Sequence, residues 1–230
     1  MGDTYFISGI DTGVGKSVAT GMMARHLQLA GRRVITVKLV QTGCHGYSED
    51  LDLHRRLMGI PPLPEDESRL TAPQIFDYPA SPHLAAALEG KTVDLKAISR
   101  AVETVGKLYD ATLVEGAGGL AVPLTEDCLT IDYVQQRRWP VILVTSGKLG
   151  AINHTILSLE ALARRHMALA GVVYNYSEDA APPIDADSPH IMQNSMKKNG
   201  FDAPFVSMGR VKIENPPTVD FSAIFREIGK

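Results

Sequence analysis

Short apolar runs alternate with segments of helical period along most of the chain. The runs at residues 4–8, 33–40, 111–115, 141–146, 169–175 and 204–208 have the apolar, β-branched composition of buried strands. Helical periodicity predicts helices at residues 17–30, 50–58, 95–109, 153–166, 189–199 and 221–228. Strands that alternate with helices in this way form a mostly parallel central sheet covered on both faces. The pattern therefore predicts an α/β fold.

Length and composition narrow the class of protein. A chain of 230 residues can be one domain, and we expect a single domain over residues 1–230. With 44% apolar residues and a net charge of −3, the chain lacks the basic excess of a nucleic-acid or anionic-membrane binder. Charged residues interrupt every apolar run, and no N-terminal signal is present. Two cysteines, Cys44 and Cys128, favour a reducing compartment, so we expect a cytoplasmic protein.

Two proline-rich segments are predicted to be loops. Residues 59–83 contain repeated prolines and read as a long irregular connection, and loops of this length are commonly functional or disordered. Residues 176–189 are polar and proline-rich, and we expect them to be exposed. Ligands of parallel sheets bind at the carboxyl ends of the strands. We therefore expect the ligand site among the segments that follow the strands, at residues 9–17, 38–43, 115–119 and 146–153 and at Asn175.

The stretch "GIDTGVGKS", residues 9–17, follows a strand and opens a helix. It is one residue longer than the usual G-x-x-x-x-G-K-[ST] phosphate loop. Its glycines allow backbone N–H groups to turn inward, Lys16 supplies charge for phosphates, and Ser17 offers a hydroxyl to Mg²⁺. The alternative is a tight turn with a chance lysine, which the strand–loop–helix context disfavours.

Charged residues near other strand ends are candidates for the same site. Glu115 ends an apolar strand and precedes a glycine turn, where a magnesium-binding carboxylate belongs. Asp50 stands among acidic residues at a helix start, where spacing alone favours a role as a first-turn dipole partner or N-cap over metal binding. Lys38 interrupts an apolar strand and needs an anion, unless the strand is an edge strand or Lys38 pairs with Glu115. Thr42 follows at the end of that strand.

Several motifs together resemble the dethiobiotin synthetase family. They are "GIDTGVGKS", "KLVQTG", "SED", "ASPH", "VEGAGGLAVPL", "KLGAINHTIL", "VVYN" and "IENP", in this order along nearly the whole chain. The longer glycine loop is the form this family has. Departures are Ser17 for the commoner threonine, Leu39 for a common proline, Tyr176 for a common acidic residue, and a poor match over residues 177–198.

The resemblance implies a reaction. The family joins CO2, in equilibrium with bicarbonate, to 7,8-diaminononanoate as a carbamate. ATP, the co-substrate, phosphorylates the carbamate, and the second amine closes a cyclic urea with loss of phosphate. Mg²⁺ is the implied cofactor, and a homodimer that shares its substrate site across the interface is the implied assembly.

The resemblance also implies the roles of residues. Lys38 is the implied catalytic residue, and Ser17, Asp50 and Glu115 are the implied magnesium ligands. The implied ATP-binding residues are Asp11, Thr12, Gly13, Val14, Gly15, Lys16, Ser17, Val18, Asn175, Glu214 and Asn215. The implied substrate-binding residues are Thr12, Lys38, Thr42, Ser81, Pro82, Gly118, Gly119, Leu149, Gly150 and Asn153.

Other phosphate-loop proteins are the alternatives. Amidotransferase ligases of the cobyrinate type need a longer chain or a second domain. Partition or septum-site ATPases act as switches on DNA or membranes and usually carry a second lysine early in the loop. The stretch "GIDTGV" before Gly15 has none, and the C-terminal segment at residues 220–230 carries little positive charge.

Overall fold

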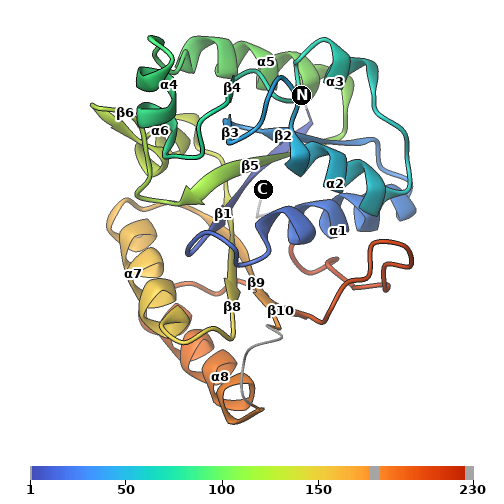
Figure 1. Cartoon of the computed structure of the whole chain (residues 1–230). Coiled ribbons are helices and arrows are strands. Elements are labelled where there is room, and N and C mark those ends of the chain that lie inside the picture. Colours follow the sequence, from blue (N-terminus) through green and yellow to red (C-terminus); the bar gives the residue numbers. More distant parts are fainter. Residues whose placement is uncertain (1, 177–181, 226–230) are drawn as a thin grey trace.

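A six-stranded parallel sheet forms the centre of the molecule. The computed structural model describes residues 2–176 and 182–225. The strand order is β10-β9-β8-β1-β5-β2, and each neighbouring pair is parallel. The strands are β1 (Asp3–Gly9), β2 (Val34–Lys38), β5 (Ala111–Gly119), β8 (Val141–Ser146), β9 (Leu169–Asn175) and β10 (Phe205–Met208). The predicted α/β class is confirmed (Figure 1).

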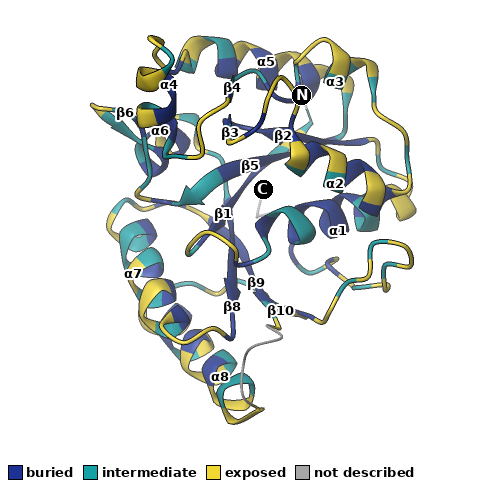
Figure 2. Cartoon of the chain, in the orientation of Figure 1, coloured by how far each residue is buried: buried dark blue, intermediate teal, exposed yellow. Residues whose placement is uncertain are grey.

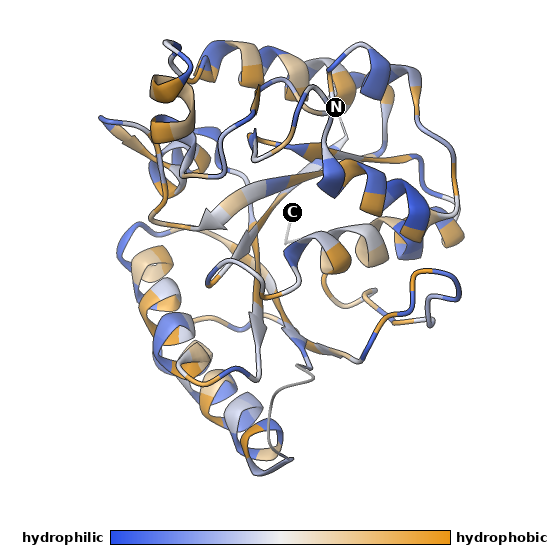
Figure 3. Ribbon diagram, in the orientation of Figure 1, coloured by the Kyte–Doolittle hydropathy of each residue, from blue (hydrophilic) through white to orange (hydrophobic). Residues whose placement is uncertain are grey.

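Helices cover both faces of this sheet because successive strand residues point to opposite sides. Tyr5 and Ile7 pack against α1 (Lys16–Leu29) and α2 (Glu49–Met58), whereas Phe6 packs into the opposite layer. That layer contains α5 (Leu95–Leu108), α6 (Thr130–Arg137), α7 (Ala151–Arg164) and α8 (Pro182–Lys198). Most strand residues are buried between the two layers, except in the edge strand β10, and apolar residues recur along the strands (Figures 2 and 3).

The position of β1 determines where a ligand can bind. β1 pairs with β5 on one side and with β8 on the other. The chain leaves β1 through α1 towards β2, which lies beyond β5, and returns later to β8 on the opposite side. A reversal of strand order of this kind opens a crevice at the carboxyl ends of the strands. The glycine loop lies in that crevice.

The segment at residues 59–83 differs from the prediction of an irregular connection. It contains the short helix α3 (Pro64–Glu67) and the strand β4 (Ile75–Phe76), which pairs with β3 (Gln41–Thr42). Its last residues begin α4 (Pro82–Leu88). Pro64 and Pro82 stand in the first turns of α3 and α4, where a missing N–H costs nothing, so these prolines start helices.

Other boundaries also depart from the sequence prediction. The elements β6 (Pro123–Thr125), β7 (Cys128–Leu129) and α6 were not predicted. Helix α8 begins at Pro182, so residues 182–189 are helical rather than part of the predicted exposed loop, and 177–181 lie outside the described residues. The predicted C-terminal helix is a turn at residues 222–225, and 226–230 lie outside the described residues. None of the described helices has the length and apolarity needed to cross a bilayer.

The N-cap of α5 offers a test of how this layer is stabilised. Asp94 accepts hydrogen bonds from the backbone N–H groups of Lys96 and Ala97 at 2.9 and 2.8 Å, and it is exposed. We expect Asp94→Ala to cost about 1 kcal/mol and to lower Tm by roughly 2–4 °C in a thermal unfolding scan. Asp94→Asn retains the acceptor and is expected to unfold near the wild-type temperature. An equal loss in both variants would show that charge, not capping, stabilises α5.

Candidate active site

The loop between β1 and α1 is shaped to hold an anion. Gly15 is the N-cap of α1 with φ 87°, a left-handed conformation that favours glycine, and a Cβ there would collide with the amide of Asn175. Helix α1 has no side-chain cap and no acidic residue in its first turn, so its N-terminal N–H groups are available to a ligand. Lys16 is 7% exposed and donates to the Asp11 carbonyl at 3.0 Å.

A second set of charges lies directly behind the loop. Lys38 and Glu115 are partners in the β2–β5 register, so their side chains leave the sheet on the same face. The Lys38 ammonium lies 2.8 Å from Glu115 Oε1 and 2.5 Å from Asp50 Oδ2. The Ser17 hydroxyl lies 2.6 Å from Asp50 Oδ1 and 2.9 Å from Glu115 Oε1. Strand β5, strand β2, helix α1 and helix α2 therefore contribute one side chain each to this cluster.

Burial and pairing set the protonation of the cluster. Burial acts to raise the pKa of Glu115, but the Lys38 ammonium and the hydrogen bond with His54 hold that pKa well below its usual value. Burial acts to lower the pKa of Lys38, but Glu115 and Asp50 raise it above its ordinary value. Both groups are therefore charged at neutral pH. Burial lowers the pKa of Lys16, and Glu115 opposes that shift.

The sequence alternatives for Lys38 and Asp50 are resolved by this geometry. Strand β2 is an edge strand of the six-stranded sheet, and Lys38 pairs with Glu115, so both structural alternatives for Lys38 are true. Lys38 nevertheless lies beside the glycine loop. Ser48, not Asp50, caps α2, since its side chain accepts from Leu51 N–H. Asp50 is in the first turn of α2 but points to Lys38 and Ser17.

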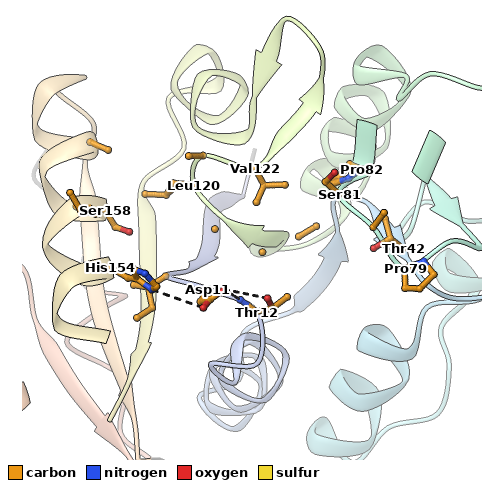
Figure 4. A pocket seen from close by; sticks show the side chains of 18 residues that line it. Asp11, Thr12, Thr42, Pro79, Ser81, Pro82, Leu120, Val122, His154 and Ser158 are labelled. Carbon is orange, nitrogen blue, oxygen red and sulfur yellow. Dashed lines mark hydrogen bonds and ion pairs between the residues drawn. The ribbon is translucent and has the colours of Figure 1, made fainter. Parts of the chain in front are cut away.

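A cavity of about 760 Å³ opens beside the loop (Figure 4). Asp11 and Thr12 of the loop form one part of its wall, and Thr42 after β2 forms another. Most of the remaining wall is apolar or small. It includes the predicted residues Ser81, Pro82, Gly118 and Gly119, together with Ile10, Pro79, Ala80, Ala117, Leu120, Ala121, Val122, His154, Leu157, Ser158 and Ala161. The structure thus brings six of the predicted substrate residues (Thr12, Thr42, Ser81, Pro82, Gly118 and Gly119) to one cavity.

The start of α7 lies near the same loop but does not line this cavity. Gly150 is the N-cap of α7 with φ 90°, and the helix has no side-chain cap and no acidic first turn. Leu149 is 94% exposed, and neither it nor Gly150 nor Asn153 is a wall residue of the cavity. The Lys148 ammonium donates to the Gly13 carbonyl at 3.2 Å, so this segment also contacts the glycine loop.

The predicted adenosine residues divide into two groups. Asn175, at the end of β9, donates from Nδ2 to the Val14 carbonyl at 3.1 Å and therefore borders the loop. Glu214 and Asn215 are exposed on the segment after β10, where the Asn215 N–H donates to the Lys212 carbonyl. Val18 follows the loop in the first turn of α1.

Sequence reasoning missed several polar residues that meet the site. His154 of α7 faces Asp11, with 4.0 Å between Nδ1 and Oδ2, and lines the cavity (Figure 4). His54 contacts Glu115 and is fully buried. No periodicity singled out His54, which stands between Leu53 and Arg55 on a short helix. Its place on the buried side of α2, three residues before Leu57, is the signal that could have found it.

Comparisons with known proteins identify the family. A family model described as an AAA domain matches residues 3–200. An ATP-dependent dethiobiotin synthetase of Pasteurella multocida is 44% identical over 213 residues, which cover 93% of this chain and 100% of that protein. The same enzyme of Chlorobaculum tepidum is 45% identical over 94% of this chain and 91% of that protein.

The chain belongs to the dethiobiotin synthetase family. Solved structures at lower identity share its fold. A pNOB8 ParA bound to nonspecific DNA has a TM-score of 0.57 at 15% identity, covering 92% of this chain and 86% of that chain. The FtsY receptor of Elizabethkingia anophelis has a TM-score of 0.52 at 14% identity, covering 97% and 64%. At such identities the likeness of this dethiobiotin synthetase-family chain to ParA and FtsY concerns the fold alone.

The loop lysine can be tested directly. We expect Lys16→Ala to lose binding of Mg·ATP, because the ammonium is the charged group that the loop carries for phosphates, while the thermal unfolding temperature stays near wild type. Calorimetric titration with Mg·ATP measures the loss. The control is Lys91→Ala, an exposed lysine paired with Glu89, which is expected to bind as wild type. Wild-type affinity in a folded Lys16→Ala protein would exclude the loop as the nucleotide site.

Proposed function

We propose that this protein is an ATP-dependent dethiobiotin synthetase. It carboxylates 7,8-diaminononanoate with CO2 and closes the cyclic urea, giving dethiobiotin, ADP and phosphate. The observation that carries the proposal is that the phosphate loop also forms part of the cavity wall. Asp11 and Thr12 belong both to the phosphate loop and to the largely apolar cavity, so a nucleotide on one side meets an aliphatic substrate on the other. We assign the whole chain to one catalytic domain and the enzyme to the cytoplasm.

The nucleotide binds along the loop in this proposal. Backbone N–H groups from Asp11 to Val18 and the uncapped start of α1 receive the phosphates, and Lys16 exchanges the Asp11 carbonyl for phosphate oxygens. Asn175 borders the far side of the loop and reads the adenine. Glu214 and Asn215 complete the adenosine end.

Three side-chain oxygens fit a magnesium ion. Asp50 Oδ1 and Glu115 Oε1 lie 2.6 and 2.9 Å from Ser17 Oγ, and oxygen ligands with one or two carboxylates suit Mg²⁺. The Lys38 ammonium already occupies a position between the two carboxylates, so the field there favours a cation. Within the described ranges no three His, Cys, Asp or Glu side chains form a metal-binding group; the set proposed here is two carboxylates and the Ser17 hydroxyl. When bound there, Mg²⁺ would supply positive charge to the phosphates of the nucleotide.

The chemistry demands neutralisation of like charges. One amine attacks CO2 and releases a proton, which leaves a negatively charged carbamate. A carbamate oxygen then attacks the γ-phosphorus, and the bond to ADP breaks. Lys38 neutralises charge on both anions, and Thr12 and Thr42 position them at the cavity wall. The second amine attacks the carbamate carbon and gives up a proton, and phosphate leaves with that proton as the ring closes.

The aliphatic part of the substrate lies against the apolar wall, beside Ser81, Pro82, Gly118 and Gly119. Its terminal carboxylate is bound by the start of a partner's α7, through Leu149, Gly150 and Asn153. Two facts favour a second chain. These residues are not wall residues of their own chain's cavity, and Leu149 is 94% exposed. Leu84, Leu88 and Leu157 are also exposed on α4 and α7, which suits a homodimer interface.

The function is tested by mixing the protein with 7,8-diaminononanoate, bicarbonate, ATP and Mg²⁺ and measuring dethiobiotin by mass spectrometry. Product formation that requires all four supports the proposal. ATP hydrolysis stimulated by DNA or lipid vesicles, with no ring product, would instead favour the partition-type switch.

The catalytic role of Lys38 predicts a specific kinetic pattern. We expect Lys38→Gln to lower kcat by roughly 10²–10³-fold, the usual effect of losing one stabilising contact to developing charge. KM for ATP should change much less, because Lys16 and the loop amides remain. Steady-state kinetics of dethiobiotin formation separate the two. A normal kcat with a raised KM for ATP would show that Lys38 acts in nucleotide binding alone.

The shared site predicts complementation between two damaged chains. Lys38→Gln disables one end of the site, and Gly150→Phe disables the other, since φ 90° strains any side chain. After subunit exchange of equal amounts, we expect about one quarter of wild-type activity, because half of random pairs are mixed and each mixed dimer has one intact site. Native mass spectrometry confirms exchange. Exchange without any rise in activity would place the carboxylate site within one chain.

A further inference from the structure

A buried chain of polar groups leads from Glu115 away from the cavity. His54 of α2 is fully buried, with Nε2 2.8 Å from Glu115 Oε2 and Nδ1 3.0 Å from Thr36 Oγ1. The Arg55 guanidinium donates from Nη1 to the same Thr36 oxygen at 2.7 Å. Glu115 thus uses Oε1 for Lys38 and Ser17 and Oε2 for His54 alone.

The donors and acceptors available fix the direction of every hydrogen bond in this series of polar groups. Arginine only donates, so Thr36 Oγ1 accepts from Arg55. The single hydroxyl proton of Thr36 is then directed to His54 Nδ1, which accepts it. The imidazole proton is therefore on Nε2 and points to Glu115 Oε2. A doubly protonated ring would leave the Thr36 hydroxyl proton without an acceptor among its described contacts.

The series of hydrogen bonds ends at Asp66, in the segment at residues 59–83. Arg55 donates from Nε and Nη2 to the two oxygens of Asp66 at 2.9 and 2.7 Å, a bidentate pair. Asp66 also accepts from the Thr71 hydroxyl and the Leu63 N–H at 2.7 Å each. Arg55 is 3% exposed, so packing as well as hydrogen bonding fixes the orientation of its guanidinium group.

We propose that His54 is a positioning residue for Glu115. The directed chain from Asp66 through Arg55 and Thr36 fixes one imidazole tautomer, and that tautomer holds the carboxylate so that Oε1 faces Ser17 and Lys38. Partners of this kind orient metal-binding side chains, and their loss typically costs 10–100-fold in affinity. The expected effect on magnesium affinity rests on the function proposed above. The assignment of the imidazole tautomer does not depend on that function.

The experiment compares variants for Mg·ADP binding by calorimetry. We expect His54→Leu, which keeps bulk but removes the donor, to weaken Mg·ADP about 10–100-fold. His54→Gln retains an N–H near Nε2 and should recover most of the affinity. Glu115→Gln gives the full loss for comparison. In turnover, the Mg²⁺ concentration for half activity should rise in His54→Leu while KM for the diaminononanoate stays constant.

A control separates positioning from loss of stability. Ser99→Ala removes a buried hydrogen bond to Tyr133, remote from the site, and should lower Tm without changing Mg·ADP affinity. If His54→Leu does not fold, Thr36→Val keeps the shape of Thr36 and removes its hydroxyl, and a weaker affinity for Mg·ADP is again expected. Nitrogen NMR of the wild-type imidazole should show the proton on Nε2.

The outcomes distinguish failure of the proposed role of His54 from failure of the proposed function. Wild-type Mg·ADP affinity in His54→Leu, or in Thr36→Val where the first variant is unfolded, overturns the role of His54, as does a ring proton on Nδ1. Loss of affinity in a protein whose wild-type form makes no dethiobiotin leaves the His54 role intact and refutes the proposed function.

Discussion

The register between β2 and β5 controls the rest of the site. Because Lys38 and Glu115 are paired positions on adjacent parallel strands, an ammonium and a carboxylate are buried side by side at the sheet edge. Removing two charges from water costs several kcal/mol per ion, and the cost is recovered only with close pairing and further hydrogen bonds. Ser17, Asp50 and His54 supply those bonds. A shift of β2 by one residue relative to β5 would turn Lys38 to the opposite face of the sheet, away from Glu115.

This constraint also positions the helices. Ser17 lies in the first turn of α1 and Asp50 in the first turn of α2. Both reach the same carboxylate–lysine pair, so the N-terminal ends of two helices converge on one point. Leu57 and Met58 of α2 pack into the same apolar layer as α1. The glycine loop is therefore held between a rigid sheet edge and two fixed helix starts, which preorganises its N–H groups for phosphate.

Much of this could be predicted from the sequence, for identifiable reasons. The buried strands are long and apolar, so periodicity identified them, and "GIDTGVGKS" and Glu115 stand where the strand–loop context requires them. The short elements β3, β4 and β6 depend on tertiary pairing rather than on a local pattern, and they were missed. Spacing alone favoured a helix-start role for Asp50, because the contact with Lys38 requires knowing that α2 lies against β2. The importance of His54 was invisible for the same reason, since only the fold brings Thr36 and Glu115 to its two nitrogens.

The charge balance of the cluster explains why a nucleotide and a metal ion are suited to bind together. Lys16 and Lys38 carry two positive charges, and Asp50 and Glu115 carry two negative charges. A site with no net charge is less costly to bury than a strongly charged one. The same neutrality means that the triphosphate of ATP, entering alone, would face two carboxylates with no surplus of positive charge. In the function proposed above, a divalent cation held by Ser17, Asp50 and Glu115 would supply that surplus and would leave Lys38 free to turn to the reacting anions. The charge balance therefore favours binding of a magnesium complex over binding of a bare nucleotide.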